Sequence, residues 1–379
     1  MADPVAVHAD PRLEPVPAHG DARHAIDAAT SAEADRYDAQ VRQRLATALA
    51  ASDGATLANL LEQAPSPEIA RHLRRLLADI ERGERTSADT LHATLFAIPV
   101  VLVAALDAGA TPVTLDAILP DASAQATLLR DAQAFGGSET FALSPALVAT
   151  DAIDLRALPA LLARASLALQ GDGFAFSALD LPPAPIRVEA AVERVHLRFI
   201  PGAILTPPHV DPLAASTIGR WGMTCANAIA RALGAPGVSL LALPRPAQDL
   251  VAAVQSGRAA QREVSAQLFA SNAIRKFRAS YGEPTAIVSA HDAPDAPGGG
   301  ELRLSLSSPF APEAAEGFRC PLYPYETVQE VSSMLDALLR DCRVSDVRFM
   351  PGIHADVDAA TRGPLFFKDH GGAPDTLSH

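Results

Sequence analysis

Two His-x-Asp pairs are the strongest candidates in this chain for acid–base catalysis or metal binding. They are His209-Val210-Asp211 and His354-Ala355-Asp356. An imidazole beside a carboxylate can act as a general base or contribute to a metal site. The helical spacing His-Glu-x-x-His is missing and no third ligand is evident, so the sequence predicts no metal site. Because Asp211 precedes Pro212, capping of a helix is the preferred interpretation of these pairs.

Each pair follows one copy of a short internal repeat. Residues 195–202 (Val-His-Leu-Arg-Phe-Ile-Pro-Gly) resemble residues 345–352 (Ser-Asp-Val-Arg-Phe-Met-Pro-Gly), and in both the Pro-Gly pair is expected to end a strand. Arg198 and Arg348 occupy the same place in the two copies. A buried arginine needs a carboxylate partner, so an ion pair to a helix acid is the preferred role. Binding of an anionic ligand is the alternative.

Other common catalytic patterns are absent from the sequence. There is no Gly-x-Ser-x-Gly, no Walker loop and no Gly-x-Gly-x-x-Gly after a predicted strand. His291-Asp292 falls in a segment rich in Pro, Gly and Asp, which predicts a loop. Cys225, Cys320 and Cys342 are far apart, so buried thiols are expected rather than a disulfide or zinc site. The sequence therefore predicts no cofactor.

Composition narrows the class of partner and the compartment. With 31 Lys and Arg against 44 Asp and Glu, the net charge is −13, which argues against nucleic acid and anionic membranes as partners. Abundant alanine and scarce lysine are typical of a GC-rich bacterial genome. The N-terminus lacks a signal-peptide pattern, and the apolar run Leu95–Leu106 is shorter than the roughly 20 residues of a membrane span. These features predict a cytoplasmic protein.

Hydrophobic periodicity predicts the α/β (α+β) class. A helical module, in which Ser66-Pro67 marks a helix start, precedes two related α/β sandwich-like units with mixed or antiparallel sheets. The unpatterned ends are expected to be flexible. The predicted organisation is an arm at 1–33, a helical module at 34–92, a first α/β unit at 93–185, second α/β unit(s) at 186–369 and a tail at 370–379.

The C-terminal part of the chain resembles a betaproteobacterial family of unknown function. The resemblance rests on residues 320–326 (Cys-Pro-Leu-Tyr-Pro-Tyr-Glu), on residues 349–352 (Phe-Met-Pro-Gly) and on residues 363–366 (Gly-Pro-Leu-Phe), and it covers about the last sixty residues. Where that family has a cysteine pair, this chain has Ala360-Thr361-Arg362, so any metal site of the pair is missing. The resemblance implies no activity.

Two classes of function remain open on these observations. The lack of a catalytic signature favours a non-catalytic scaffold, assembly or regulatory protein that acts through protein–protein contacts or as a homo-oligomer. The alternative is a small-molecule enzyme or an anionic-ligand-binding protein with its site at the Pro-Gly strand ends. The residues of that site would be Arg198, His209, Asp211, Arg348, His354 and Asp356. Convergence of His209 and His354 on one cavity would favour the enzyme.

Overall fold

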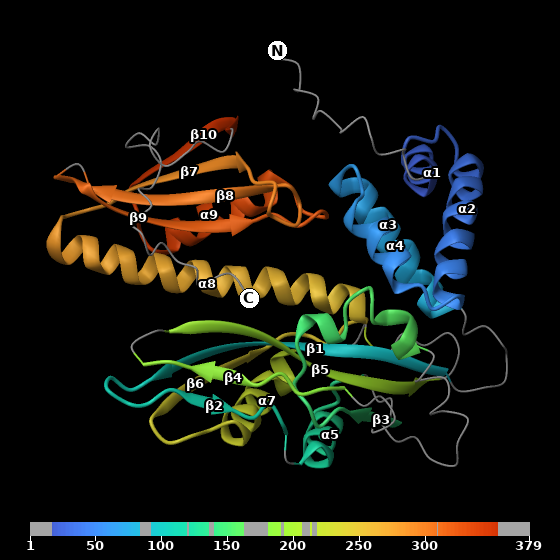
Figure 1. The fold of residues 1–379 in the computed structure, drawn as a ribbon, viewed down its shortest axis with the longest axis horizontal. Coiled ribbons are helices and arrows are strands. Elements are labelled where there is room, and N and C mark those ends of the chain that lie inside the picture. The colour runs from blue at the N-terminus through green and yellow to red at the C-terminus, as the bar shows by residue number, and fades with distance from the viewer. Residues whose placement is uncertain are drawn as a thin grey trace.

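The computed structural model describes residues 17–83, 92–119, 121–135, 140–162, 181–190, 193–206, 213, 218–308 and 310–354. In the described residues a group of helices comes first, and two four-stranded β-sheets with further helices follow, as Figure 1 shows. This arrangement confirms the predicted α+β class, the N-terminal helical region and the mixed or antiparallel sheets.

The N-terminal helices are α1 (Pro17–Ile26), α2 (Ser31–Ala50), α3 (Gly54–Glu62) and α4 (Pro67–Gly83). Side chains of Thr30, Asp53 and Ser66 accept hydrogen bonds from the first turns of α2, α3 and α4, which confirms the helix start expected at Ser66-Pro67. Leucines of these helices share one buried core. The arm expected over residues 1–33 differs from the structure, because the buried Ala18 and Ala22 pack α1 into that core; residues 1–16 lie outside the described part.

The first sheet has the order β3-β5-β1-β6, and all its neighbouring strands are antiparallel. Its strands are β1 (His92–Leu106), β3 (Thr140–Leu143), β5 (Arg194–Thr206) and β6 (Val238–Pro244). One face of β1 packs on the N-terminal helices and α8 (Leu250–Ser280), and the other packs on α5 (Ala122–Asp131) and α7 (Ile218–Ala232). Strand β1 is therefore buried on both of its faces. A short ribbon of β2 (Val113–Leu115) and β4 (Ile186–Val188) and the 3-10 turn η1 (Thr150–Ala152) complete this region.

The Pro-Gly pair does not end β5, contrary to the prediction. The strand runs on through Gly202 to Thr206. Pro201 has no N–H to donate, but its nitrogen faces the interval between the end of β3 at Leu143 and the bridge from Val148 to Phe199. Its carbonyl oxygen accepts from the Ser144 N–H at 2.8 Å. A proline is tolerated in this interior strand because the neighbouring strand has already turned away.

The second sheet has the order β10-β7-β8-β9. Its strands are β7 (Thr285–Asp292), β8 (Gly300–Ser308), β9 (Ala311–Pro321) and β10 (Asp346–His354). Strand β10 lies at the edge, parallel to β7, while the other pairs are antiparallel. Strand β10 also continues through its Pro-Gly pair, with a shift of register between Phe349 and Ile353. Helices α8 and α9 (Val328–Asp341) cover one face of the sheet.

Helix α8 runs between the two sheets (Figure 1). Its first half, with Leu250 and Val254, belongs to the core of the first sheet. Its second half, with Ile274 and Phe277, belongs to the core of the second sheet. The predicted boundary at residue 186 differs from this arrangement, because β5 is an interior strand of the first sheet. The period-2 pattern of an isolated strand does not say which sheet it joins.

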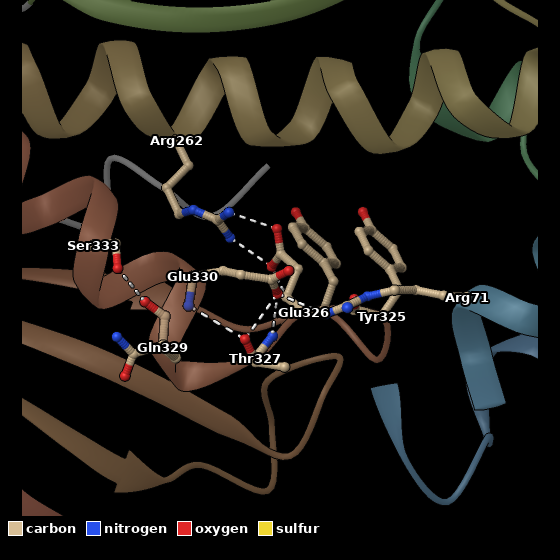
Figure 2. Close-up of polar contacts among 9 residues, drawn as sticks. Arg71, Arg262, Tyr325, Glu326, Thr327, Gln329, Glu330 and Ser333 are labelled. Carbon is tan, nitrogen blue, oxygen red and sulfur yellow. Dashed lines mark hydrogen bonds and ion pairs between the residues drawn. The ribbon is translucent and has the colours of Figure 1, made fainter. Parts of the chain in front are cut away.

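A polar junction ties the helical region to α8 and the β9–α9 loop (Figure 2). Arg262 of α8 donates to both carboxylate oxygens of Glu326, at 2.7 and 2.5 Å. Arg71 of α4 donates to the Tyr325 carbonyl oxygen at 2.8 Å and to Glu330 at 2.6 Å. The rings of Tyr323 and Tyr325 stack with centroids 5.7 Å apart. The loop after β9 therefore joins three parts of the fold.

Candidate functional site

Arg198, a predicted site residue, is bound by the backbone of its own chain. Its guanidinium in β5 donates to the carbonyl oxygens of Ala184, Leu197 and Pro185 at 2.8, 2.8 and 3.0 Å. Burial lowers the pKa of this guanidinium, and the charge of Asp151 opposes that effect. The expected ion pair to a helix acid is replaced by three backbone acceptors. Arg198 thus fixes the segment before β4 against the first sheet.

Arg348 forms a local ion pair on the edge strand of the second sheet. Its guanidinium donates to the two carboxylate oxygens of Asp346 at 3.0 and 2.8 Å. Thr285 on β7 also donates to Asp346, at 2.9 Å. These hydrogen bonds from Arg348 and Thr285 hold the pKa of the Asp346 carboxyl below its ordinary value. The partner is a strand acid two residues away, not the helix acid that the sequence suggested.

The predicted site residues do not form one constellation in the part of the chain that the structure describes. Arg198 lies in the first sheet, whereas Arg348 and His354 lie in β10 of the second. His209, Asp211 and Asp356 fall outside the described residues. The convergence of His209 and His354 stays a prediction.

His354 instead lies beside a histidine that the sequence placed in a loop. His291 belongs to β7, is buried, and stands in register with His354 on the parallel neighbour β10. Their ring centroids are 5.5 Å apart. Ser289, two residues earlier on the same face of β7, has its hydroxyl oxygen 2.8 Å from Nε2 of His291. The structure therefore brings together two imidazoles and one hydroxyl.

A carboxylate and two guanidinium groups continue this polar face across β8 and β9. Glu301 stands in register with His291 and accepts from Arg303 at 2.5 Å and from Arg319 at 2.8 Å. Glu301 and Arg303 are buried, whereas the Arg319 side chain is 53% exposed. The cluster thus reaches solvent at the β9 side. We call Ser289, His291, Glu301, Arg303, Arg319 and His354 the polar sheet cluster.

The chemistry that the polar sheet cluster offers is that of a hydroxyl beside a base. A serine hydroxyl within hydrogen-bond distance of an imidazole is the usual arrangement of an activated nucleophile. Guanidinium groups close by suit an anionic group. One signal of this cluster is present in the sequence, the alternation of polar Ser289 and His291 with apolar Val288 and Ala290, which is typical of a strand rather than a loop.

The described residues provide no metal centre. Within them, no three His, Cys, Asp or Glu side chains gather closely enough to hold an ion. Burial raises the pKa of the Cys225 and Cys320 thiols to about 12, so neither is a thiolate at neutral pH. Every helix in the described part of the chain is too short or too polar to cross a bilayer.

Comparisons of the chain with family models, with curated proteins and with solved structures found no match. The resemblance of the C-terminal residues to a family of unknown function stays a prediction.

Proposed function

We propose that this protein is a non-catalytic scaffold of the bacterial cytoplasm that associates with a second copy of itself through β10. The observation that carries the proposal is an edge strand with two large apolar side chains in solvent. Phe349 is 44% exposed and Ile353 is 60% exposed. Exposed apolar groups gathered on one strand are typical of an interaction surface.

A groove next to β10 supplies the complementary shape. It lies between β10 and α9, has a volume of about 380 Å³, and is lined by Val288 and Leu302 at the sheet and by Ser333 on the helix. Phe349 is also one of its lining residues. A protruding side chain and a hollow on the same surface fit a two-fold contact, in which each copy inserts into the other.

The backbone of β10 favours side-chain contacts over a continuous sheet between copies. Pro351 has no N–H to donate, and the strand shifts register between Phe349 and Ile353. Both features are typical of edges that resist strand addition. The Asp346–Arg348 ion pair carries no net charge beside the patch. Two chains that each carry a net charge of −13 repel each other. We expect salt to screen this repulsion and so to strengthen the association.

Light scattering over a concentration series tests the proposal. The double variant Phe349→Ser/Ile353→Ser removes both apolar side chains and should give a monomer where the unaltered protein is a dimer. Met223→Ser is the matched control, because Met223 is 75% exposed on α7, far along the chain from β10. A monomer before any substitution, or a dimer that survives the double variant, rules out this surface.

The second candidate function is a hydrolase or an anion-binding protein that uses the polar sheet cluster. The specific observation in its favour is the 2.8 Å contact between the Ser289 hydroxyl and Nε2 of His291. A fluorophosphonate probe should then label Ser289 and fail to label Ser289→Ala, while Ser333→Ala on α9 keeps the labelling. Ser289 is 2% exposed, so absence of labelling in the unaltered protein rejects a Ser289 nucleophile that a substrate can reach.

A further inference from the structure

The second sheet has helices on only one of its faces in the described part of the chain. Ala286 and Val288 of β7 and Leu302 and Leu304 of β8 pack in one core with α8 and α9. Because side chains alternate along a strand, the residues between them point to the opposite side of the sheet. We call that side the outer face; it carries Ile287, Ser289 and His291 of β7 and Glu301, Arg303 and Ser305 of β8.

The side chains of the outer face are nevertheless buried. Arg303 is 4% exposed and Ser305 is 5% exposed, although both stand in a sheet only four strands wide. One face of an antiparallel sheet can be in contact with water, and a long guanidinium side chain there normally reaches solvent. Burial to this degree requires atoms packed on the outer face. Since the described helices that pack on this sheet lie on its other side, a stretch of chain outside the described residues is the source that remains.

Residues 355–379 are the best-placed stretch, because they follow β10 directly. His354 ends that strand, and its ring centroid lies 5.5 Å from that of His291 on the outer face. The chain therefore leaves the described part beside this face. Three strand spacings, about 14 Å, separate β10 from β9, and ten extended residues reach about 33 Å. The segment is long enough to cross the whole sheet.

The composition of residues 355–379 complements that of the outer face. Arg303 and its neighbour Arg319 on β9 share the carboxylate of Glu301, so the guanidinium groups are in excess there. The segment contains four aspartates against one arginine and one lysine, so its charge has the opposite sign. It also contains the run Leu-Phe-Phe at 365–367, whose exposure to water is unfavourable, and Ile287 offers an apolar contact on the outer face.

We propose that residues 355–379 lie across the outer face, with the run 365–367 against Ile287, and shield Ser289 and His291 from solvent. A reactant would then reach these two side chains only when the segment is displaced. Phe349 lines the groove beside α9, on the opposite side of the sheet. The proposal therefore does not depend on self-association through β10.

Residues 1–16 are the alternative cover. They precede α1, which packs on the core of the helical region. The stretches 84–91, 163–180 and 207–217 are held at both ends by elements of the helical region or of the first sheet, away from the outer face. A decisive test therefore compares the two ends of the chain.

The reactivity of a thiol placed on the outer face tests the proposal. Ser305→Cys, combined with Cys342→Ser in the whole chain, leaves two other thiols, both of them buried. A chromogenic disulfide reagent should modify the new thiol slowly. Phe366→Ser/Phe367→Ser should raise that rate at least tenfold, because it removes the apolar contact that holds the segment. Val5→Ser/Val7→Ser is the matched control for the N-terminal stretch and should leave the rate unchanged.

Limited digestion with chymotrypsin gives a second readout on the unaltered chain. This protease cuts after aromatic residues, so the proposed packing should delay cleavage after Phe366 and Phe367, which mass spectrometry detects. Fast reaction of Ser305→Cys before any change in the segment, an equal rate with Phe366→Ser/Phe367→Ser, or a rise with Val5→Ser/Val7→Ser overturns the proposal. Should Ser305→Cys fail to fold, the digestion decides alone, and early cleavage after either phenylalanine contradicts the cover.

Discussion

The protonation state of a titratable residue in this protein depends on its burial and on the charges around it. His196 on β5 is a case in which the fold selects the protonation state. Burial, and then the charges of Arg198 and Arg194, lower the pKa of its imidazole from 6.5 to about 4. The imidazole is therefore neutral in the folded state at physiological pH, although the sequence places it in a strand rich in arginine.

A pH dependence of stability follows from His196. Because the unfolded chain takes up the proton between pH 6.5 and pH 4 and the folded chain does not, the unfolding free energy falls as the pH falls through that window. We expect this residue to contribute about 2 kcal/mol of that loss, given its partial exposure to solvent. Urea unfolding at pH 7.0 and 4.5 measures it. His196→Gln should reduce the difference by that amount, and an unchanged difference contradicts the assignment.

Thiol reactivity gives a second test at the residue scale. Cys225 and Cys320 are buried, whereas Cys342 at the end of α9 is partly exposed. We expect a chromogenic disulfide reagent to modify one thiol in the folded protein and all three after denaturation. Cys342→Ser should abolish the fast reaction. Fast modification of two or more thiols in the native state contradicts the packing of α7 or of β9.

At the scale of elements, Gly202 allows the neighbouring strands β1 and β5 to pack closely, because it leaves room for the ring of Phe96. A Cβ on Gly202 of β5 would lie 2.2 Å from the ring of Phe96 on β1. Gly202→Ala should therefore lower the unfolding free energy by about 1–3 kcal/mol, because the ring must move in a packed core. Gly219→Ala is the control, since no atom lies within 4 Å of its Cβ in α7. We expect that change to be neutral or to stabilise by up to about 1 kcal/mol.

Sequence reasoning succeeded where local pattern determines the element and failed where distant residues do. The helix start at Ser66-Pro67 is a local signal, and the Ser66 cap is present. The fate of Pro201-Gly202 depends on where β3 ends, about sixty residues earlier in the chain. The pairing of His354 with His291 depends on β10 lying parallel to β7, and no spacing of residues in the sequence indicates that neighbour. The repeated motif therefore predicted a strand end at each Pro-Gly pair, whereas both strands continue past it.

At the scale of the whole molecule, the polar junction holds three parts together. The Arg262–Glu326 pair is its most buried member, with both side chains 10% exposed. Arg262→Ala leaves a buried carboxylate without its guanidinium, so we expect a loss of about 3–5 kcal/mol in urea unfolding. Arg245→Ala is the matched control, because its pair with Glu263 at 3.2 Å is solvent-exposed and should matter by less than about 1 kcal/mol. Equal losses for the two variants would show that the polar junction does not stabilise the packing of these three parts.

The most direct test of the proposed function is the mass of this chain in solution. We expect light scattering to give twice the 39.5 kDa chain mass at micromolar concentration, with dissociation on dilution and a tighter dimer at higher salt. The Phe349→Ser/Ile353→Ser variant should give the mass of one chain at every concentration. A single-chain mass for the unaltered protein across the whole series, at low and high salt alike, would contradict the self-association of this scaffold.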